Sequence, residues 1–381
     1  MSASVLDQLT LGYRLLWSRR REIAAVELHL DPLTQAGSID ARHLLATLAE
    51  LWPTRAPQLL LRARHPLLLL DLLAQGRADA PWLVLPAEVL TDAVLRPRAQ
   101  QAQARGLPLL WPGVPAEGAL PGARPGLYLS DDAPAAPSAG QIVLSAGRRA
   151  QGDAALDQHA AWALAGWPVE DVLDSLSAQA RQPDRTAISR VVRAIDDDAD
   201  LDRIEALLCA DPVLAYRFLQ HVNTTAPKLR GEIDTLQRGL QVWGLRHVQA
   251  WLLAQLPQAA SEPDLQPVRL GMVTRARLLE HLLDAGDEED LRSEVRLCGL
   301  FSQLDRLLGE PLATVLERLP LSQRILQALL EHSGPYHPAL QLARVLESAD
   351  TRATRQLSES YGYTPEDVNR ALLRTLATLT N

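Results

Sequence analysis

The first 170 or so residues alternate short apolar runs with segments of helical periodicity. Two of the intervening segments, 40–51 and 90–105, have the apolar spacing of amphipathic helices. Apolar runs separated in this way are typical of parallel strands joined by crossover helices, so we expect an α/β layer or barrel. The region 112–138 is crowded with proline, glycine and alanine and is expected to form long surface loops. The expected strands lie at 23–30, 58–62, 82–85, 107–111 and 141–145.

From about residue 183 onward the pattern changes to one amphipathic helix after another. Asp211 is suited to cap a helix N-terminus, with Pro212 at the first helical position, where its missing N–H costs nothing. This helix is expected to end near Asn223. Gly244 separates two later helices and is expected to be a left-handed C-cap. The second half is therefore predicted to be all-helical, with further helices at 235–243, 245–256, 273–283, 291–308, 321–331, 339–348 and 364–379.

The composition favours a folded protein of two domains, because 381 residues exceed what one core usually serves and 47% of them are apolar. The net charge of -8 repels phosphate backbones and anionic lipid, so neither nucleic acid nor a membrane is expected as a partner. The richest apolar run, 66–73, is too short to span a bilayer, and the N-terminus lacks the pattern of a secretion signal. We therefore expect a cytoplasmic protein.

The basic residues are almost all arginine, since Lys228 is the single lysine in the chain. The sequence has no P-loop, and Schiff-base chemistry would rest on Lys228 alone, in an expected loop. Cys209 and Cys298 lie within apolar helical patterns and are expected to be buried free thiols, because two cysteines cannot form a disulfide framework or a thiolate metal site.

Metal-dependent hydrolysis is not supported by the histidines. An HD-type phosphohydrolase holds its metals with separated histidines, an adjacent His-Asp pair and a further aspartate, and no His-Asp dipeptide occurs here. The histidines of the second half are scattered, so no pair of them is expected to ligate a metal; they are His221, His247, His281, His332 and His337. His332 and His337 flank an expected loop and are expected to face solvent or to bind backbone groups.

Three other functional motifs are also incomplete. The aspartates at 196–202 lack the glycine and glutamate of a calcium-binding loop and are expected to form a solvated, helix-capping linker. The helix pair at 235–256 resembles a helix-turn-helix, but its second helix carries Trp251 and adjacent leucines, so a core hairpin is favoured over a DNA reader. The chain has no Gly-x-Ser-x-Gly elbow, and neither cysteine has an activating context.

The C-terminal half resembles the HDOD domain, a helical module related to HD phosphohydrolases that typically lacks their metal ligands. The resemblance runs through 204–224, where Asp211 and Pro212 stand at the family's Asp-Pro opening and Asn223 at its Asn-Ser close, with threonine replacing the serine. Further matching segments lie at 233–236, 243–245, 299–305 and 319–321, within a span of 183–350.

The later segments resemble the branch in which HDOD follows an EAL domain, and the N-terminal half is similar to an EAL domain in outline. Glu27 would occupy the metal-binding glutamate position of the Glu-Ala-Leu signature. The resemblance implies further carboxylates and a lysine, but 82–86 and 106–113 replace the strands that carry the carboxylates, and 126–132 has no lysine. Two-metal hydrolysis of cyclic di-GMP cannot proceed with one surviving carboxylate.

We therefore expect a degenerate EAL-like (β/α) barrel at 1–175 and an HDOD helical domain at 180–381. The expected function is non-enzymatic signal transduction through a protein partner, with no catalytic residue, metal or cofactor and no residual phosphodiesterase or phosphohydrolase activity. The segment after Asp350 has no assigned role.

An alternative keeps the barrel as a receptor that binds cyclic di-GMP without cutting it. Arg14, Arg62 and Arg64 could meet its phosphates and guanines if they lie at the C-terminal ends of the strands, where barrel sites are built. Surface exposure or ion pairing of these arginines is the simpler interpretation.

Overall fold

The computed structural model describes residues 4–34, 39–112, 124–128, 139–177, 181–225, 232–284 and 289–379. The chain forms two compact units. The first, the barrel unit, combines Met1–Asp171 with Leu342–Asn381, and the second, the helical unit, is the intervening segment Val172–Gln341. Lys228 lies outside the described residues.

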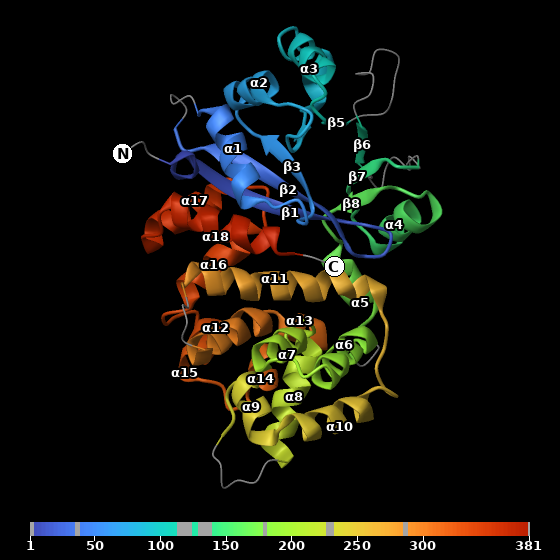
Figure 1. Cartoon of the computed structure of the whole chain (residues 1–381), viewed down its shortest axis with the longest axis vertical. Helices are drawn as coiled ribbons and strands as arrows, with labels where there is room; N and C mark the ends of the chain where they lie inside the picture. Colours follow the sequence, from blue (N-terminus) through green and yellow to red (C-terminus); the bar gives the residue numbers. More distant parts are fainter. Residues whose placement is uncertain are drawn as a thin grey trace. The chain divides into compact units, whose positions relative to one another are not determined.

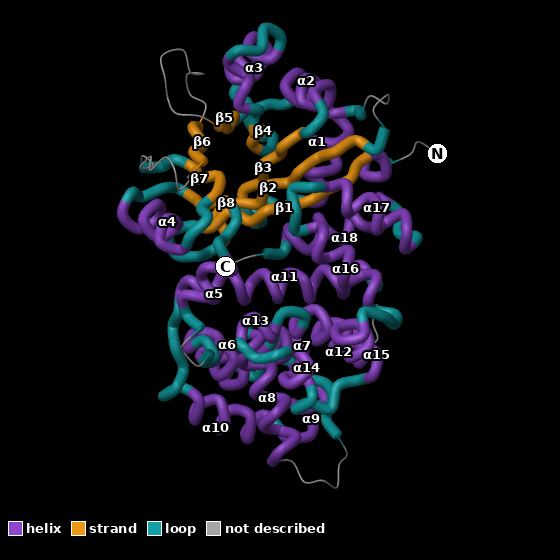
Figure 2. Tube along the Cα trace, turned by 180° about the vertical axis from the view of Figure 1, so that it is seen from behind, coloured by secondary structure: helices purple, strands orange, loops and turns teal. Residues whose placement is uncertain are grey.

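Eight strands close into a barrel in the first unit (Figure 2). The hairpin after the first strand reverses the chain through a hydrogen bond from Ser18 N to Glu22 O. The first strand is consequently antiparallel to both of its neighbours, whereas all the other neighbouring strands are parallel. The strands are β1 Leu9–Trp17, β2 Ile23–Pro32, β3 Gln58–Ala63, β4 Trp82–Val84, β5 Leu109–Pro112, β6 Arg124–Tyr128, β7 Ile142–Ser145 and β8 Ala163–Ala165.

The helices between the strands follow the apolar spacing of the sequence. Asp40 caps the first of them by accepting hydrogen bonds from two backbone N–H groups, and Leu44 and Leu48 of that helix are buried. The helices of this part are α1 Ala41–Leu51, α2 Pro66–Gln75, α3 Leu95–Ala104, α4 Arg149–Asp153 and α5 Val169–Ser175.

The expectation of surface loops throughout 112–138 is wrong at β6. This strand pairs with β5 on one side and β7 on the other, so its backbone is satisfied by two neighbours. Pro125 and Gly126 are poor strand formers, which is why the local pattern hides a strand that tertiary pairing creates. The three-residue β8 is likewise too short to give a periodic signal.

An apolar layer fills the interior of the barrel. Side chains from β1, β2, β3, β4, β5, β7 and β8 meet in one buried cluster, and the stacked rings of Trp82 and Trp162, 5.4 Å apart, pack near it. The members of this layer include Leu16, Ala25, Leu60, Val84 and Leu110. Because side chains alternate along a strand, these residues identify the inward-facing positions on each strand.

The last two helices, α17 Thr351–Tyr361 and α18 Pro365–Ala377, pack on β1 (Figure 1). Asn369 is 1% exposed; its Nδ2 donates to the carbonyls of Leu6 and Leu9, each at 2.8 Å, and its Oδ1 accepts from Leu11 N at 3.2 Å. No crossover helix follows β1, and α17 and α18 cover it instead. The sequence-based boundary placed 180–381 in one domain, whereas the contacts group Leu342–Asn381 with the barrel.

The helical unit contains the helices expected from the sequence between 183 and 331, and two of them are divided. The expected helix 321–331 changes from α-helical to π-helical at Gln327. The expected helix 291–308 is broken near Gln303 into two shorter helices. No helix of the described ranges is long and apolar enough to cross a membrane. The helices are α6 Arg185–Asp196, α7 Leu201–Leu208, α8 Pro212–Thr225, α9 Leu236–Trp243, α10 Leu245–Gln255, α11 Gln266–Leu282, α12 Glu289–Phe301, α13 Leu304–Leu308, α14 Leu312–Leu316 and α15 Gln323–Leu326. The next helix, α16 His337–Leu346, contains the boundary between the two units.

Candidate functional site

The barrel interior carries a small group of charged and polar side chains beside its apolar layer. On β1, Arg14 lies on the same face as the inward-facing Leu16. On β2, Glu27 and His29 share the face of Ala25, and on β3, Arg62 shares the face of Leu60. Arg14 pairs in register with Glu27 across β1 and β2, and His29 with Arg62 across β2 and β3. These four residues, here called the mouth cluster, lie toward the C-terminal ends of the parallel strands, where barrel sites are built.

Glu27 is the centre of the mouth cluster. Its side chain is 1% exposed. Oε2 accepts hydrogen bonds from Arg14 Nε at 3.0 Å and Nη2 at 2.6 Å, and Oε1 accepts one from Arg62 Nε at 2.6 Å. Both carboxylate oxygens are therefore bound by guanidinium groups.

The arginines differ in how far the described protein satisfies them. The remaining nitrogen of Arg14, Nη1, donates a hydrogen bond to the carbonyl of Leu144 at 3.0 Å, which links β1 to β7. Arg62 Nη2 is buried and finds no hydrogen-bond partner among the described residues. Their side chains are 25% and 21% exposed, so solvent or a ligand can still reach both guanidinium groups.

The charges of the mouth cluster shift its titration. Burial alone would raise the pKa of Glu27, but the positive charges of Arg14 and Arg62 outweigh it and lower the pKa to about 2. Burial also lowers the pKa of His29; the nearby Glu27 carboxylate opposes this effect, and repulsion by the arginines adds to it, giving about 4. The cluster is therefore an ionised carboxylate between two cations, beside a neutral imidazole.

His29 is the residue that the sequence analysis missed. Its Nε2 lies 3.9 Å from Glu27 Oε2 and, within the described part of the chain, has no hydrogen-bond partner. The available signal was its spacing, because a residue two positions after Glu27 on a strand faces the same side.

Arg64, the third arginine expected in a ligand site, is not part of the set that binds Glu27. It follows the end of β3, its side chain is 42% exposed, and its Nη1 lies 3.7 Å from Asp350 Oδ1. The structure thus brings Arg14 and Arg62 together on one carboxylate and leaves Arg64 at an exposed ion pair.

The other strands add no carboxylate to this interior in the described ranges. The inward positions of β4 and β5 are Val84 and Leu110. No group of three or more His, Cys, Asp or Glu side chains that could hold a metal occurs among the described residues. The segment 129–132, at the end of the stretch where a lysine would be expected, lies outside them.

The HDOD signature residues of the helical unit have structural contacts. Asp211 is fully buried and caps α8 as expected: Oδ1 accepts from Val213 N at 2.8 Å, and Oδ2 accepts from Asp184 N at 2.6 Å. Pro212 stands at the first helical position, also as expected. Arg269 lies 3.7 Å from the Asp211 carboxylate and compensates its charge.

Asn223 and Gly244 serve the backbone as well. The Asn223 side chain donates to Ile233 O at 2.8 Å and accepts from Ile233 N at 3.0 Å, which fastens the end of α8 to the chain before α9. Gly244 has the expected positive φ of 79°, but its ψ of 143° lies outside the left-handed helical region that was expected.

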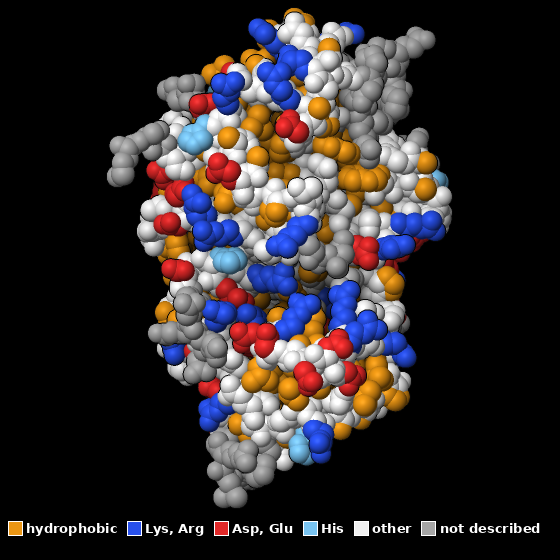
Figure 3. Space-filling model, viewed as in Figure 1, with side chains coloured by type: hydrophobic (Ala, Val, Ile, Leu, Met, Phe, Trp, Pro, Cys, Tyr) orange, Lys and Arg blue, Asp and Glu red, His pale blue; other side chains and the backbone are white. Residues whose placement is uncertain are grey.

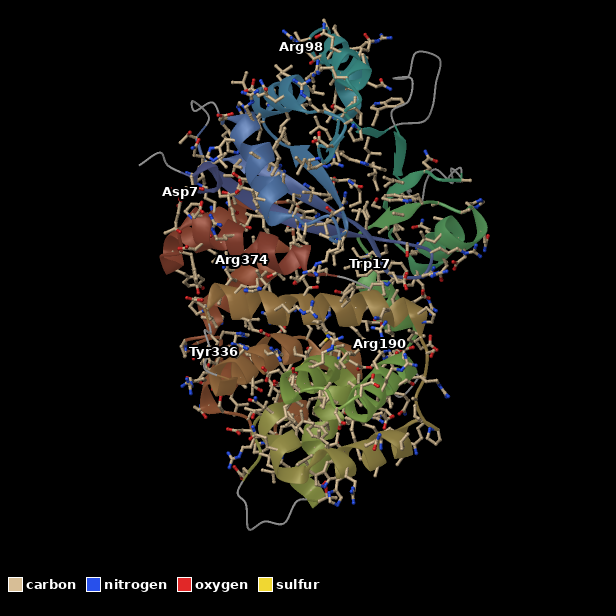
Figure 4. All side chains as sticks on the ribbon, in the orientation of Figure 1. Asp7, Trp17, Arg98, Arg190, Tyr336 and Arg374 are labelled. Atoms are coloured by element: carbon tan, nitrogen blue, oxygen red, sulfur yellow. The ribbon has the colours of Figure 1, made fainter. Side chains whose placement is uncertain are left out.

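The histidines of the helical unit form no metal-binding group among the described residues. His221 stacks on Trp251 with ring centroids 5.6 Å apart, and His247 Nδ1 lies 3.0 Å from Trp243 O. Tyr336, labelled in Figure 4, precedes His337, whose ring is 5.9 Å from that of His332.

Comparison with known proteins identifies the helical unit in part. Residues 184–308 match the family model of the HDOD domain. The chain is 28% identical over 177 residues to the cyclic di-GMP phosphodiesterase CdgJ of Vibrio cholerae, covering 46% of this chain and 41% of that protein. It is 24% identical over 156 residues to the uncharacterised protein YuxH of Bacillus subtilis, covering 40% and 38% respectively. The chain thus spans about two fifths of the length of the curated relatives it matches.

Among solved structures, the crystal structure of the MmoQ response regulator from Methylococcus capsulatus is similar with a TM-score of 0.41 and 17% identity. The match covers 51% of this chain and 98% of that one.

Proposed function

We propose that this protein is a non-enzymatic regulator in cyclic di-GMP signalling, in which a degenerate EAL-like barrel and an HDOD domain act through a protein partner. The single observation that carries the proposal is the binding of both Glu27 oxygens by Arg14 and Arg62. The HDOD domain and the likeness to a cyclic di-GMP phosphodiesterase support the pathway.

The chemistry of the mouth cluster opposes metal-dependent hydrolysis. A two-metal site needs several convergent carboxylates that together neutralise the cations. Glu27 stands between two arginines, and a divalent ion approaching it would meet two positive charges and a carboxylate whose two oxygens both accept hydrogen bonds from guanidinium groups. In this proposal the barrel unit keeps a glutamate, Glu27, at the position of a metal ligand, but that glutamate no longer binds a metal.

The test is turnover of cyclic di-GMP with Mg²⁺ or Mn²⁺, followed by chromatography for the linear product. The full chain is expected to give no product under conditions in which an active phosphodiesterase converts the substrate completely. The Arg14→Ala/Arg62→Ala double variant, which frees Glu27, is expected to stay inactive because the other ligands are absent. Metal-dependent product formation by the wild-type protein would refute the proposal.

A second candidate function is a receptor that binds cyclic di-GMP without cleaving it. The observation that favours it is Arg62 Nη2, a buried guanidinium nitrogen with no partner in the described ranges, beside the unpartnered Nε2 of His29. A phosphate oxygen would satisfy the first and a guanine acceptor or donor the second. Arg14 and the more exposed Arg64 could add phosphate contacts.

Calorimetric titration with cyclic di-GMP tests the receptor. Arg62→Lys keeps the positive charge but removes the paired N–H donors of the guanidinium group. An affinity for cyclic di-GMP about tenfold or more lower in this variant would support the receptor. The matched control is Arg98→Lys, at an exposed position on α3 that Figure 4 labels. Absence of binding, or equal affinity in Arg62→Lys and the wild-type protein, would remove the receptor and leave the protein-interaction function.

A further inference from the structure

A pocket of about 190 Å³ opens in the helical unit, between α7, α11 and α12, within that unit alone. Its charged lining comes from two neighbouring helices: Arg277 and Glu280 from α11, and Arg296 from α12. His281 and Cys209 also line it. Every Lys or Arg side chain in Figure 3 is an arginine, because the single lysine lies outside the described residues.

Arg296 is fully engaged by carboxylates. Its Nε donates to Glu280 Oε1 at 2.6 Å, its Nη2 donates to Glu280 Oε2 at 3.2 Å, and its Nη1 lies 3.4 Å from Glu205 Oε2. The hydroxyl of Ser293 donates to the other oxygen of Glu205. The hydrogen bonds and the close ion pair of Glu280 and Glu205 are thus made with Arg296, and Glu280 acts on Arg277 only through its charge at a longer range.

Arg277 stands in the same pocket without such a partner. It is half-buried, and no described residue forms a hydrogen bond or an ion pair with its guanidinium. Burial is the main cause that lowers the pKa of Arg277; the nearby Glu280 carboxylate opposes this effect, and repulsion by Arg296 and Arg203 adds to it. A partly buried guanidinium without a hydrogen-bonded counter-charge costs free energy, which a bound anion would recover.

The backbone holds these groups in a fixed geometry. A Cβ built on Gly299 of α12 would lie 2.5 Å from Ala276 Cα of α11, so the two helices touch backbone to backbone. Ala276 immediately precedes Arg277, and Arg296 lies one turn before Gly299. The close crossing therefore fixes the separation of the two helix backbones that carry Arg277 and Arg296.

We propose that this pocket binds a small oxyanion, a phosphate or carboxylate group, with Arg277 as its principal ligand. A planar guanidinium fork matches both kinds of oxyanion, and the cavity admits such a group with a small organic body attached. The arginines and the carboxylate that line the pocket sum to one positive charge, in a chain whose net charge is -8. The site is independent of the barrel and gives the HDOD unit a ligand of its own.

Thermal unfolding of the full chain in chloride buffer, with added inorganic phosphate or acetate, tests the site. The melting temperature of the wild-type protein is expected to rise with one or both anions, because a ligand of the native state stabilises it. Arg277→Gln removes the unpaired charge, so it is expected to melt higher than the wild-type protein without anion and to lose the response. Arg246→Gln, at an exposed site on α10, is the matched control and is expected to keep the response.

Calorimetry with the same two anions separates the sources. A response to phosphate alone assigns a phosphate ligand, and a response to acetate alone assigns a carboxylate; Arg277→Lys is expected to weaken either about tenfold. The proposal is overturned if neither anion binds the wild-type protein, or if Arg277→Gln binds as tightly as Arg246→Gln. A higher melting temperature of Arg277→Gln also shows that the variant folds, so loss of binding cannot be assigned to misfolding.

Discussion

At the scale of one residue, Glu27 is a buried charge that its neighbours compensate. A glutamate inside a barrel is costly unless its charge is compensated, and Arg14 and Arg62 supply two positive charges for one negative charge. The same pairing that stabilises the carboxylate makes it unavailable to a cation. The sequence alone suggested Glu27 and the two arginines separately, and only the register of β1, β2 and β3 joins them.

Glu27→Gln should destabilise the barrel unit. It leaves two partly buried guanidinium groups without a counter-charge, and we expect the free energy of unfolding to fall by about 3 kcal/mol. This value is at the low end for buried pairs because both arginines keep part of their surface in water. Urea unfolding measures it, with the exposed Glu88→Gln as control. Equal stabilities of the two variants would contradict the ion-pair account.

Mild acid should destabilise the barrel unit through His29. Its pKa is lowered from 6.5 in the unfolded chain to about 4 in the folded one, so the unfolded state binds more protons between these values. Stability is therefore lost as the pH falls through this window, by about 1 to 2 kcal/mol between pH 7 and 5. Urea unfolding of His29→Gln at both pH values should show a smaller loss, whereas the exposed His43→Gln should behave like the wild-type protein.

Glu27 adds to the acid sensitivity at lower pH. Its folded pKa of about 2 lies below the ordinary 4.5, so its contribution is complete above 4.5 and is lost as the pH falls toward 2.

Among the elements, α18 has the contact that pattern reading could not foresee. Its amphipathic spacing predicted a helix, and the helix is present with Thr364 as its N-cap. The helix packs on the barrel through Asn369, whose side chain forms hydrogen bonds with the backbone of the short helix η1, Val5–Gln8, and of β1. More than 350 residues of chain separate these partners. Long-range pairing of this kind leaves no local signal.

Asn369→Ala should loosen α18 from the barrel. It removes three hydrogen bonds and leaves buried backbone groups of Leu6, Leu9 and Leu11 without a partner, so we expect a loss of about 2 to 4 kcal/mol in the free energy of unfolding. Hydrogen exchange at Leu11 N should speed up in parallel. Arg374→Ala, on the exposed side of the same helix (Figure 4), is the control, and an equally large effect there would refute the specific role of Asn369.

Gly244 tests the turn between α9 and α10. No described atom would lie within 4 Å of an added Cβ, so the obstacle to a side chain is the backbone conformation at φ 79° and ψ 143°. Gly244→Ala is expected to cost about 1 to 3 kcal/mol by thermal unfolding. Gly271→Ala, equally free of contacts but inside α11, is expected to be neutral or stabilising. A neutral result at Gly244 would contradict the strain argument.

At the scale of the whole molecule, the sequence predicts the two classes of structure well and their boundary less completely. The strand at 23–30 and the helix pair around Gly244 follow local periodicity and capping, and both are found. The strand β6 and the return of Leu342–Asn381 to the barrel are products of tertiary pairing. The mouth cluster depends equally on register, which apolar patterns specify only by face.

The central claim is that Glu27 is held by arginines and does not bind a divalent metal. The most direct test is paramagnetic broadening of the His29 imidazole signal by Mn²⁺ in the full chain, since His29 Nε2 lies 3.9 Å from the Glu27 carboxylate. We predict that stoichiometric Mn²⁺ leaves His29 as sharp as the exposed His43. Selective loss of the His29 signal would place a metal at Glu27 and contradict the account.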